Sequence, residues 1–126
     1  MVETPPTAQP ALRLSTMPAD ANAYGDIFGG WLVGQMDLAA GLVASRHCHG
    51  RAVTVAIDAI KFHAPVKVGD EVSIFAELAK VGRTSMTIEV EAWRRERSAD
   101  ESCRVTQATF VFVAVDDAGR PRVVAG

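Results

Sequence analysis

Residues 27–45 form an almost entirely apolar run that contains one charged residue, Asp37. If this run is a helix, the residues one turn from Asp37 in each direction are small and apolar: Val33, Gly34, Ala40 and Gly41. A buried carboxylate in such surroundings is costly unless it is paired or has a chemical role. An exposed helix face would instead carry Lys, Arg or Glu, and none occurs here. The run therefore predicts a well-packed helix and makes Asp37 the first candidate for chemistry.

The overall composition favours one ordinary globular domain. The chain has 126 residues, 48% of them hydrophobic, which is enough for a core without disulfides. Its two isolated cysteines, Cys48 and Cys103, fit a reducing compartment, so we expect a cytoplasmic protein. A net charge of −2 gives no sign of nucleic-acid or membrane-surface binding. We expect neither a membrane span, because glycines, Gln35 and Asp37 interrupt the apolar run, nor a signal peptide in residues 1–11.

After the apolar run the hydrophobic period changes from about 3.6 residues to 2. We expect the helix to begin at Gly29-Gly30 and to end near His47, with residues 18–28 as a loop before it. Strands are predicted at 12–17, 52–64, 71–81, 84–94 and 103–115, with a tight turn at Gly82-Arg83. The last segment contains TFVFVAV, which is apolar on both faces, as is typical of a central strand.

One long helix with four or five antiparallel strands predicts a two-layer α+β domain. A single helix covers only one face of such a sheet, and this helix is apolar around most of its circumference. We therefore expect an obligate homo-oligomer, at least a two-fold dimer.

Several motifs follow one another in a fixed order over most of the chain. They are NAYGDIFGGWLVGQMD at 22–37, VTVAID at 53–58, FHAPV at 62–66, VGD at 68–70, KVGRTS at 80–85, VT at 105–106 and FVAVD at 112–116. This series resembles the hot-dog-fold acyl-CoA thioester hydrolases, and within them the bacterial broad-specificity, YciA-type branch. One departure is Tyr24, where the relatives commonly carry a small polar residue such as Asn.

The resemblance implies a hot-dog fold, in which one long central helix is wrapped by a five-stranded antiparallel sheet. It divides the chain into an extended lead-in at 1–11, a thioesterase domain at 12–120 and a tail at 121–126. It also implies dimers whose sheets join edge to edge, with possible assembly into tetramers or hexamers.

The expected chemistry is hydrolysis of an acyl-CoA to a free fatty acid and CoA. No G-x-S-x-G motif or supported Cys/His pair is present, so Asp37 is assigned as general base or nucleophile. The resemblance implies that Asn22 of the other subunit is its partner. The amides that open the helix are unpaired donors at its positive end, so an oxyanion hole is expected at Gly30, with Gly29 and Trp31 beside it.

The resemblance further implies that the turn after Gly82 lies beside the nucleotide of CoA. We expect Arg83 to bind a phosphate there, with Thr84 and Ser85 next to it. CoA is then part of the substrate, and we expect no separate cofactor and no metal. The sequence His47-Cys48-His49 looks like half of a metal site, but no second ligand pair has a suitable spacing.

Structural interpretations compete with several of these assignments. Asn22 is also a common turn residue, Gly29-Gly30 a helix start, and Arg83 a solvated hairpin tip. The arginines of residues 94–97 either hold a ribose phosphate or, as we favour, form a solvated loop, and the role of Asp58 stays open.

Two other functions compete with hydrolysis. A hot-dog dehydratase would need a histidine at its active centre, and the helix has none before His47. A non-catalytic acyl-CoA-binding protein would have no need of the Asn22 and Asp37 pair.

Overall fold

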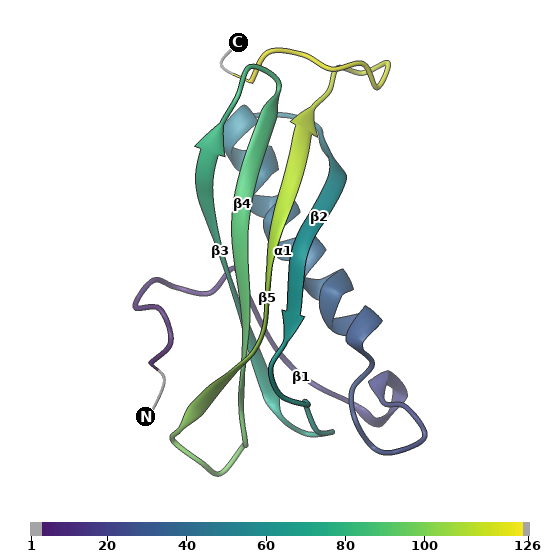
Figure 1. The fold of residues 1–126 in the computed structure, drawn as a ribbon, viewed down its shortest axis with the longest axis vertical. Helices are drawn as coiled ribbons and strands as arrows, with labels where there is room; N and C mark the ends of the chain where they lie inside the picture. The colour runs from purple at the N-terminus through teal and green to yellow at the C-terminus, as the bar shows by residue number, and fades with distance from the viewer. Residues whose placement is uncertain (1–3, 125–126) are drawn as a thin grey trace.

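The computed structural model describes residues 4–124 as one helix lying across a five-stranded antiparallel sheet (Figure 1). The elements are β1 (Leu12–Ser15), the short 3-10 helix η1 (Pro18–Asp20), α1 (Gly29–Cys48), β2 (Ala52–Phe62), β3 (Glu71–Val81), β4 (Ser85–Arg95) and β5 (Ser102–Ala114). The strand order is β1-β3-β4-β5-β2. The predicted two-layer α+β fold is confirmed.

The sequence placed most element ends within two residues of their observed positions. Helix α1 begins at Gly29 as predicted and ends at Cys48. Strands β4 and β5 are each displaced by one residue from the predicted ranges. Strand β5, which contains most of TFVFVAV, lies between β4 and β2, so its prediction as a central strand is confirmed.

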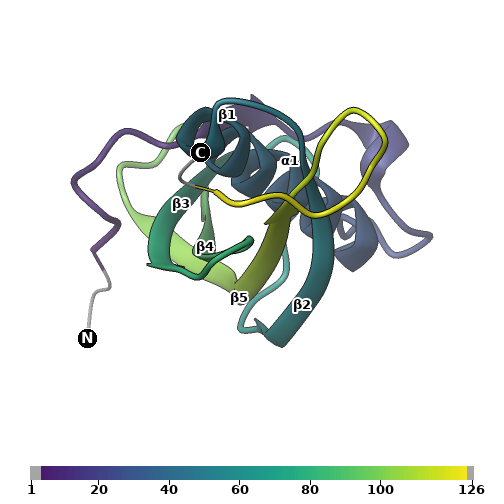
Figure 2. The same ribbon diagram turned by 90° about the horizontal axis from the view of Figure 1, so that it is seen from above.

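Helix α1 packs on one face of the curved sheet (Figure 2). Its buried residues recur at helical spacing, and half of them are alanines: Leu32, Met36, Ala39, Ala40, Ala44 and Cys48. These short side chains allow the helix axis to approach the sheet closely, above core residues such as Phe110 and Ile88.

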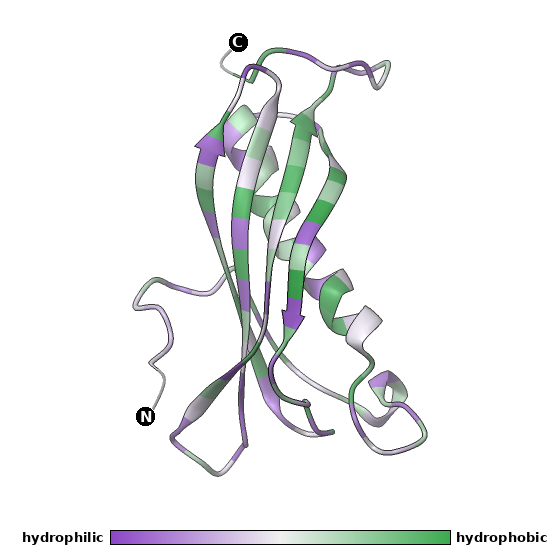
Figure 3. Cartoon of the chain, viewed as in Figure 1, coloured by the Kyte–Doolittle hydropathy of each residue, from purple (hydrophilic) through white to green (hydrophobic). Residues whose placement is uncertain are grey.

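Helix α1 carries hydrophobic residues along most of its length (Figure 3), and its outward side includes exposed leucines. Leu38 and Leu42 lie one turn apart and are 59% and 56% exposed. Within residues 4–124, no helix combines the length and hydropathy that crossing a bilayer requires. Neighbouring exposed leucines are a feature that surfaces in contact with another protein often share.

Strand β2 is an edge strand and does not follow the simple alternation that the sequence predicted. Its pairing with β5 shifts register twice, between Thr54 and Ala56 and between Asp58 and Lys61. In the second bulge Ala59 has φ +52°, a left-handed conformation that costs roughly 1–2 kcal/mol for a residue with a Cβ. Bulges of this kind re-aim side chains at sheet edges and beside active sites.

The two bulges decide which β2 residues face the helix. Thr54 pairs with the buried Phe112 and faces α1, whereas Asp58 pairs with Thr109 on the opposite face. Phe62 returns to the helix side, opposite the buried Thr106. The period of 2 expected from the sequence would place Thr54, Asp58 and Phe62 on one face, and this is wrong for Asp58, because the extra residue of each bulge reverses the alternation.

Residues 115–124 close the end of the domain where α1 stops. Val124 is buried and its amide donates to the carbonyl of Arg83. The Arg122 guanidinium donates from Nη2 to the Cys48 carbonyl at 2.9 Å and from Nε to the Val115 carbonyl. A cation at this position satisfies carbonyls that the helix end leaves without partners.

Candidate functional site

Asp37 lies on the flank of α1 that faces the edge strand β2. Its Oδ1 accepts a hydrogen bond of 2.6 Å from the hydroxyl of Thr54. The carboxylate is half-buried, and among residues 4–124 it forms no ion pair with an arginine or lysine. Within the protomer, the hydroxyl of Thr54 on β2 covers one side of this carboxylate.

Thr54 is a site residue that the sequence did not reveal. It is 17 residues from Asp37, and it reaches the helix because its pairing with Phe112 places it on the helix side of β2. A hydroxyl that binds Oδ1 leaves Oδ2 free and limits rotation of the carboxylate. Thr54 therefore fixes the direction in which the second oxygen points.

Asn22 has a structural role in the loop before α1. Its Oδ1 accepts hydrogen bonds from the backbone amides of Tyr24 at 2.8 Å and Asp26 at 3.1 Å. The backbone amide of Asn22 also donates to the carbonyl of Asp26. Both acceptor positions of the side-chain oxygen are used, so only the NH₂ group is left to act on another molecule.

The start of α1 has none of the usual capping interactions. Phe28 is the N-cap residue, it makes no side-chain cap bond, and the first turn holds no acidic residue. The first amide with a helical partner is that of Leu32, which donates to the Phe28 carbonyl at 3.2 Å. The amides of Gly29, Gly30 and Trp31 precede it and stand at the positive end of the helix.

Gly30 is the most open of these positions. A Cβ added there would meet nothing within 4 Å, whereas one added at Gly29 would lie 3.3 Å from the ring of Phe62. Gly30 therefore carries no side chain and faces open space within this protomer on the side where a Cβ would lie. The geometry fits a donor that stabilises negative charge on an oxygen.

The helix start and Asp37 cannot act on the same atom within one protomer. Gly30 and Asp37 are seven residues apart on a continuous helix, which separates them by about 10 Å along its axis. A complete site that uses both groups needs the helix start of one copy beside Asp37 of another.

The turn between β3 and β4 lies at the opposite end of the protomer from the start of α1 (Figure 1). It is held by backbone bonds, from the Gly82 amide to the Ser85 carbonyl and from the Ala114 amide to the Thr84 carbonyl. The Arg83 side chain is exposed, whereas Thr84 and Ser85 are partly buried. The structure thus places the predicted phosphate-binding residues together but far from the predicted oxyanion donors of the same chain.

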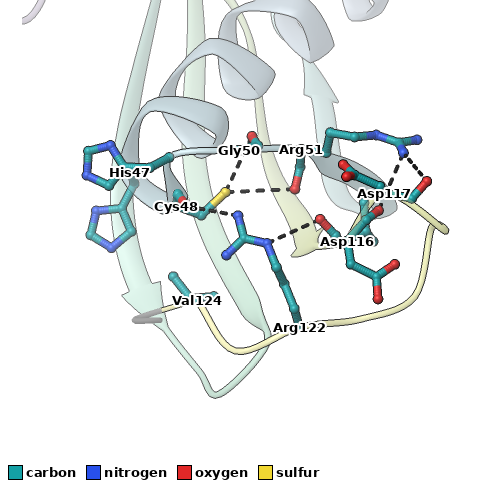
Figure 4. Close-up of a pocket in the computed structure, with 10 residues that line it drawn as sticks. His47, Cys48, Gly50, Arg51, Asp116, Asp117, Arg122 and Val124 are labelled. Carbon is teal, nitrogen blue, oxygen red and sulfur yellow. Dashed lines mark hydrogen bonds between the residues drawn. The ribbon is translucent and has the colours of Figure 1, made fainter.

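A cavity of about 650 Å³ lies beside this turn, where α1 ends (Figure 4). Its polar side chains mostly bind the backbone: Arg122 as described above, Arg51 to the carbonyls of Asp116 and Asp117, and the Cys48 thiol to the carbonyls of Gly50 and Arg51. Residues 4–124 contain no cluster of three or more metal-ligating side chains. In the His47-Cys48-His49 sequence, Cys48 is the last residue of α1 and His49 is its C-cap.

The arginines of residues 94–97 are structural. Arg94 pairs with the buried Asp70, and Arg95 pairs with Glu71 at 2.8 Å. Arg97 donates to the Gly69 carbonyl and to the hydroxyl of Ser15. These bonds tie the β4–β5 connection to β1 and β3, which supports the structural interpretation of this loop.

Comparison with known proteins identifies the family. The model of the thioesterase superfamily matches residues 24–99. An acyl-CoA thioester hydrolase of Zymomonas mobilis is 58% identical over 92% of this chain and 78% of its own. The acyl-CoA thioester hydrolase YciA of Escherichia coli is 42% identical over 94% of this chain and 92% of its own.

The structural comparison agrees. HI0827, a hexameric broad-specificity acyl-coenzyme A thioesterase solved as an aspartate-to-alanine mutant, is 44% identical and superposes with a TM-score of 0.88 over 91% of this chain and 85% of its own. The chain belongs to the hot-dog-fold acyl-CoA thioester hydrolases. The predicted family and hot-dog fold are thus confirmed.

This thioesterase-family protomer leaves one edge of its sheet open at β2. Several of its larger apolar side chains on this strand are exposed, including Val53 at 42%, Val55 at 55% and Ile60 at 38%. Open, apolar edge strands pair readily with another chain. Strand β2 also carries Thr54, so a partner seated on this edge would cover the outer side of the Asp37 site.

We expect Val55→Glu to break the oligomer. In a two-fold interface the substitution is present in both subunits, so two carboxylates would be buried or brought close together. Light scattering after size-exclusion chromatography should show protomers in place of the wild-type assembly. The control is Val123→Glu, at an exposed valine outside β2 and α1, which should leave the mass unchanged. An unchanged mass for Val55→Glu would exclude β2 as the interface.

Proposed function

We propose that this protein hydrolyses acyl-CoA thioesters to a carboxylic acid and CoA, as its YciA relatives are named for doing. The observation that carries the proposal is the carboxylate of Asp37, oriented by Thr54 on an otherwise apolar helix. The aspartate-to-alanine form of HI0827 supports a key acidic residue in this family.

Asp37 acts as general base or as nucleophile. As a base, its free oxygen takes a proton from water while the water oxygen attacks the thioester carbon. The carbonyl electrons move to the oxygen, and they return when the C–S bond breaks. The proton held by Asp37 then goes to the departing thiolate of CoA. As a nucleophile, Asp37 would form an acyl anhydride with loss of the thiolate, and water would hydrolyse the anhydride.

A second subunit completes the site. Two copies joined along β2 by a two-fold axis perpendicular to the strands run antiparallel, so the start of one α1 approaches the middle of the other. The Gly30 amide, with Gly29 and Trp31, then faces the developing oxyanion near the partner's Asp37. Asn22 contributes its NH₂ group as a second donor, because its oxygen already holds its own loop.

The same two-fold arrangement explains the location of Arg83. Antiparallel pairing places the helix start of one protomer toward the end of the other that carries the β3–β4 turn. Arg83 then binds a phosphate of CoA with its exposed guanidinium, and Thr84 and Ser85 support the turn. By analogy with HI0827, we propose that three such dimers form a hexamer.

Asp37→Asn should lower kcat by at least about a hundredfold, since the amide cannot take a proton from water. CoA release is followed with a thiol-reactive dye on acetyl-, butyryl- and palmitoyl-CoA. The matched control is Asp58→Asn, which changes an exposed acid on the opposite face of the sheet. Wild-type protein that binds acyl-CoA without releasing CoA would indicate a non-catalytic protein, and interconversion of enoyl and 3-hydroxyacyl forms would indicate a dehydratase.

Thr54→Val should lower kcat by about tenfold with little change in KM, because the carboxylate loses the bond that orients it while the side-chain volume is kept. Thr54→Ser retains the hydroxyl and should keep most of the wild-type rate. A loss in Thr54→Ser with a wild-type rate in Thr54→Val would show that the methyl group, and not the hydroxyl, is what matters.

Arg83→Ala should raise KM about tenfold and leave kcat nearly unchanged, because a phosphate contact far from the thioester binds ground and transition states alike. Steady-state kinetics with butyryl-CoA measures both constants. Arg120→Ala, at an exposed arginine in the nearby turn, is the control. A fall in kcat at constant KM would contradict a role in phosphate binding.

A further inference from the structure

A second cavity lies against the start of α1, on the side of strand β2. Its volume is about 350 Å³, and its lining side chains are apolar except for one histidine: Ile27, Leu32, Phe62, His63, Ala64, Pro65 and Val66, with Gly29 at the helix start. This size and this apolar character are typical of small-ligand sites. The cavity adjoins the first residue of α1, Gly29.

Phe62 forms one wall of this cavity because of the second bulge in β2. Asp58 pairs with Thr109 and Lys61 pairs with Gln107, so one extra residue is present in β2 between these two pairs. That residue turns Phe62 to the helix side of the sheet. Its ring then lies against Gly29, 3.3 Å from where a Cβ would stand, although the side chain is still 56% exposed.

The apolar lining of the cavity favours a hydrocarbon chain over the pantetheine arm of CoA. The pantetheine arm of CoA carries two amides, whose burial without hydrogen-bond partners costs free energy. Among the lining side chains only His63 has polar atoms, and its Nε2 lies 3.3 Å from Oε1 of Gln107. A hydrocarbon chain has no such requirement, and each methylene that leaves water contributes roughly 0.8 kcal/mol.

We propose that this cavity holds the acyl chain of the substrate and that Phe62 and Ala64 set the chain length that the enzyme prefers. The inference rests on the proposed thioester hydrolysis, since it takes the carbonyl oxygen to lie at the Gly30 amide. The first carbons of the acyl chain then pass Gly29 and enter between Phe62 and Leu32. Glycine at position 29 lets the Phe62 ring lie against the helix start, where it can line the path of the chain.

The test is the profile of kcat/KM against acyl length, from acetyl- to dodecanoyl-CoA. Ala64→Leu adds three carbon atoms to the lining and should lower kcat/KM for the longer chains at least tenfold relative to acetyl-CoA. Phe62→Ala should do the reverse and favour longer chains. Ala118→Leu is the matched control, because it makes the same change at an exposed alanine in the turn after β5 and should keep the wild-type profile.

Opposite changes of the kcat/KM profile in Ala64→Leu and Phe62→Ala would support the assignment. Loss of stability alone would lower kcat/KM for all chain lengths together. The assignment would be overturned if both folded variants changed kcat/KM equally for all chain lengths, or if both kept the wild-type profile. Thermal melting of each variant identifies misfolding. Phe62→Leu, the milder substitution, takes the place of Phe62→Ala if that variant does not fold.

Failure of the proposed hydrolysis would appear differently, as wild-type protein that releases no CoA from any substrate. The cavity is then tested by calorimetry with S-alkyl-CoA thioethers, which are not hydrolysed. The assignment of the cavity is supported if affinity rises with alkyl length in the wild type but no longer rises with alkyl length in Ala64→Leu. Affinity independent of alkyl length in the wild type overturns it.

Discussion

The constant rise of α1 is the constraint on which the rest of the structure depends. It holds the amide of Gly30 and the carboxylate of Asp37 about 10 Å apart on one rigid element. No side-chain motion brings these groups to one carbonyl, so a single protomer has two halves of two different sites. In the proposed mechanism, the open edge of β2 and the exposed leucines of α1 are the surfaces through which a second copy supplies the missing half.

Much of the fold was predictable because its signals are local. The apolar period, the glycines at 29–30 and the turn at 82–83 placed α1, β3 and β4 almost to the residue. The bulges of β2 gave no such signal. The residue with the left-handed backbone is Ala59, whereas glycine is the residue that usually marks this conformation. The position of Thr54 depends on pairing with β5, more than 50 residues later in the chain, so its contact with Asp37 could not be predicted from the local sequence.

The roles of the site residues could also be predicted only in part from the sequence. The sequence presented the structural and catalytic roles of Asn22 as alternatives, but the structure makes them compatible. An amide side chain has an acceptor end and a donor end, and the loop uses only the acceptor end. The arginines at 94, 95 and 83 look alike in the sequence. The first two are paired with Asp70 and Glu71 across the sheet, and only the turn leaves its arginine exposed.

The edge strand β2 has two tasks, and its two bulges keep Asp58 off the helix side while it performs them. It must present a pairing edge to another chain, and it must turn Thr54 and Phe62 toward α1 at points far apart along its length. In an uninterrupted strand the side of Thr54 would also hold Asp58, which would place a second carboxylate next to the helix and the cavity. The first bulge moves Asp58 to the other face, and the second returns Phe62. The strain at Ala59 is small compared with burying an unpaired carboxylate, so an irregular strand is the more stable way to build both an interface and a site.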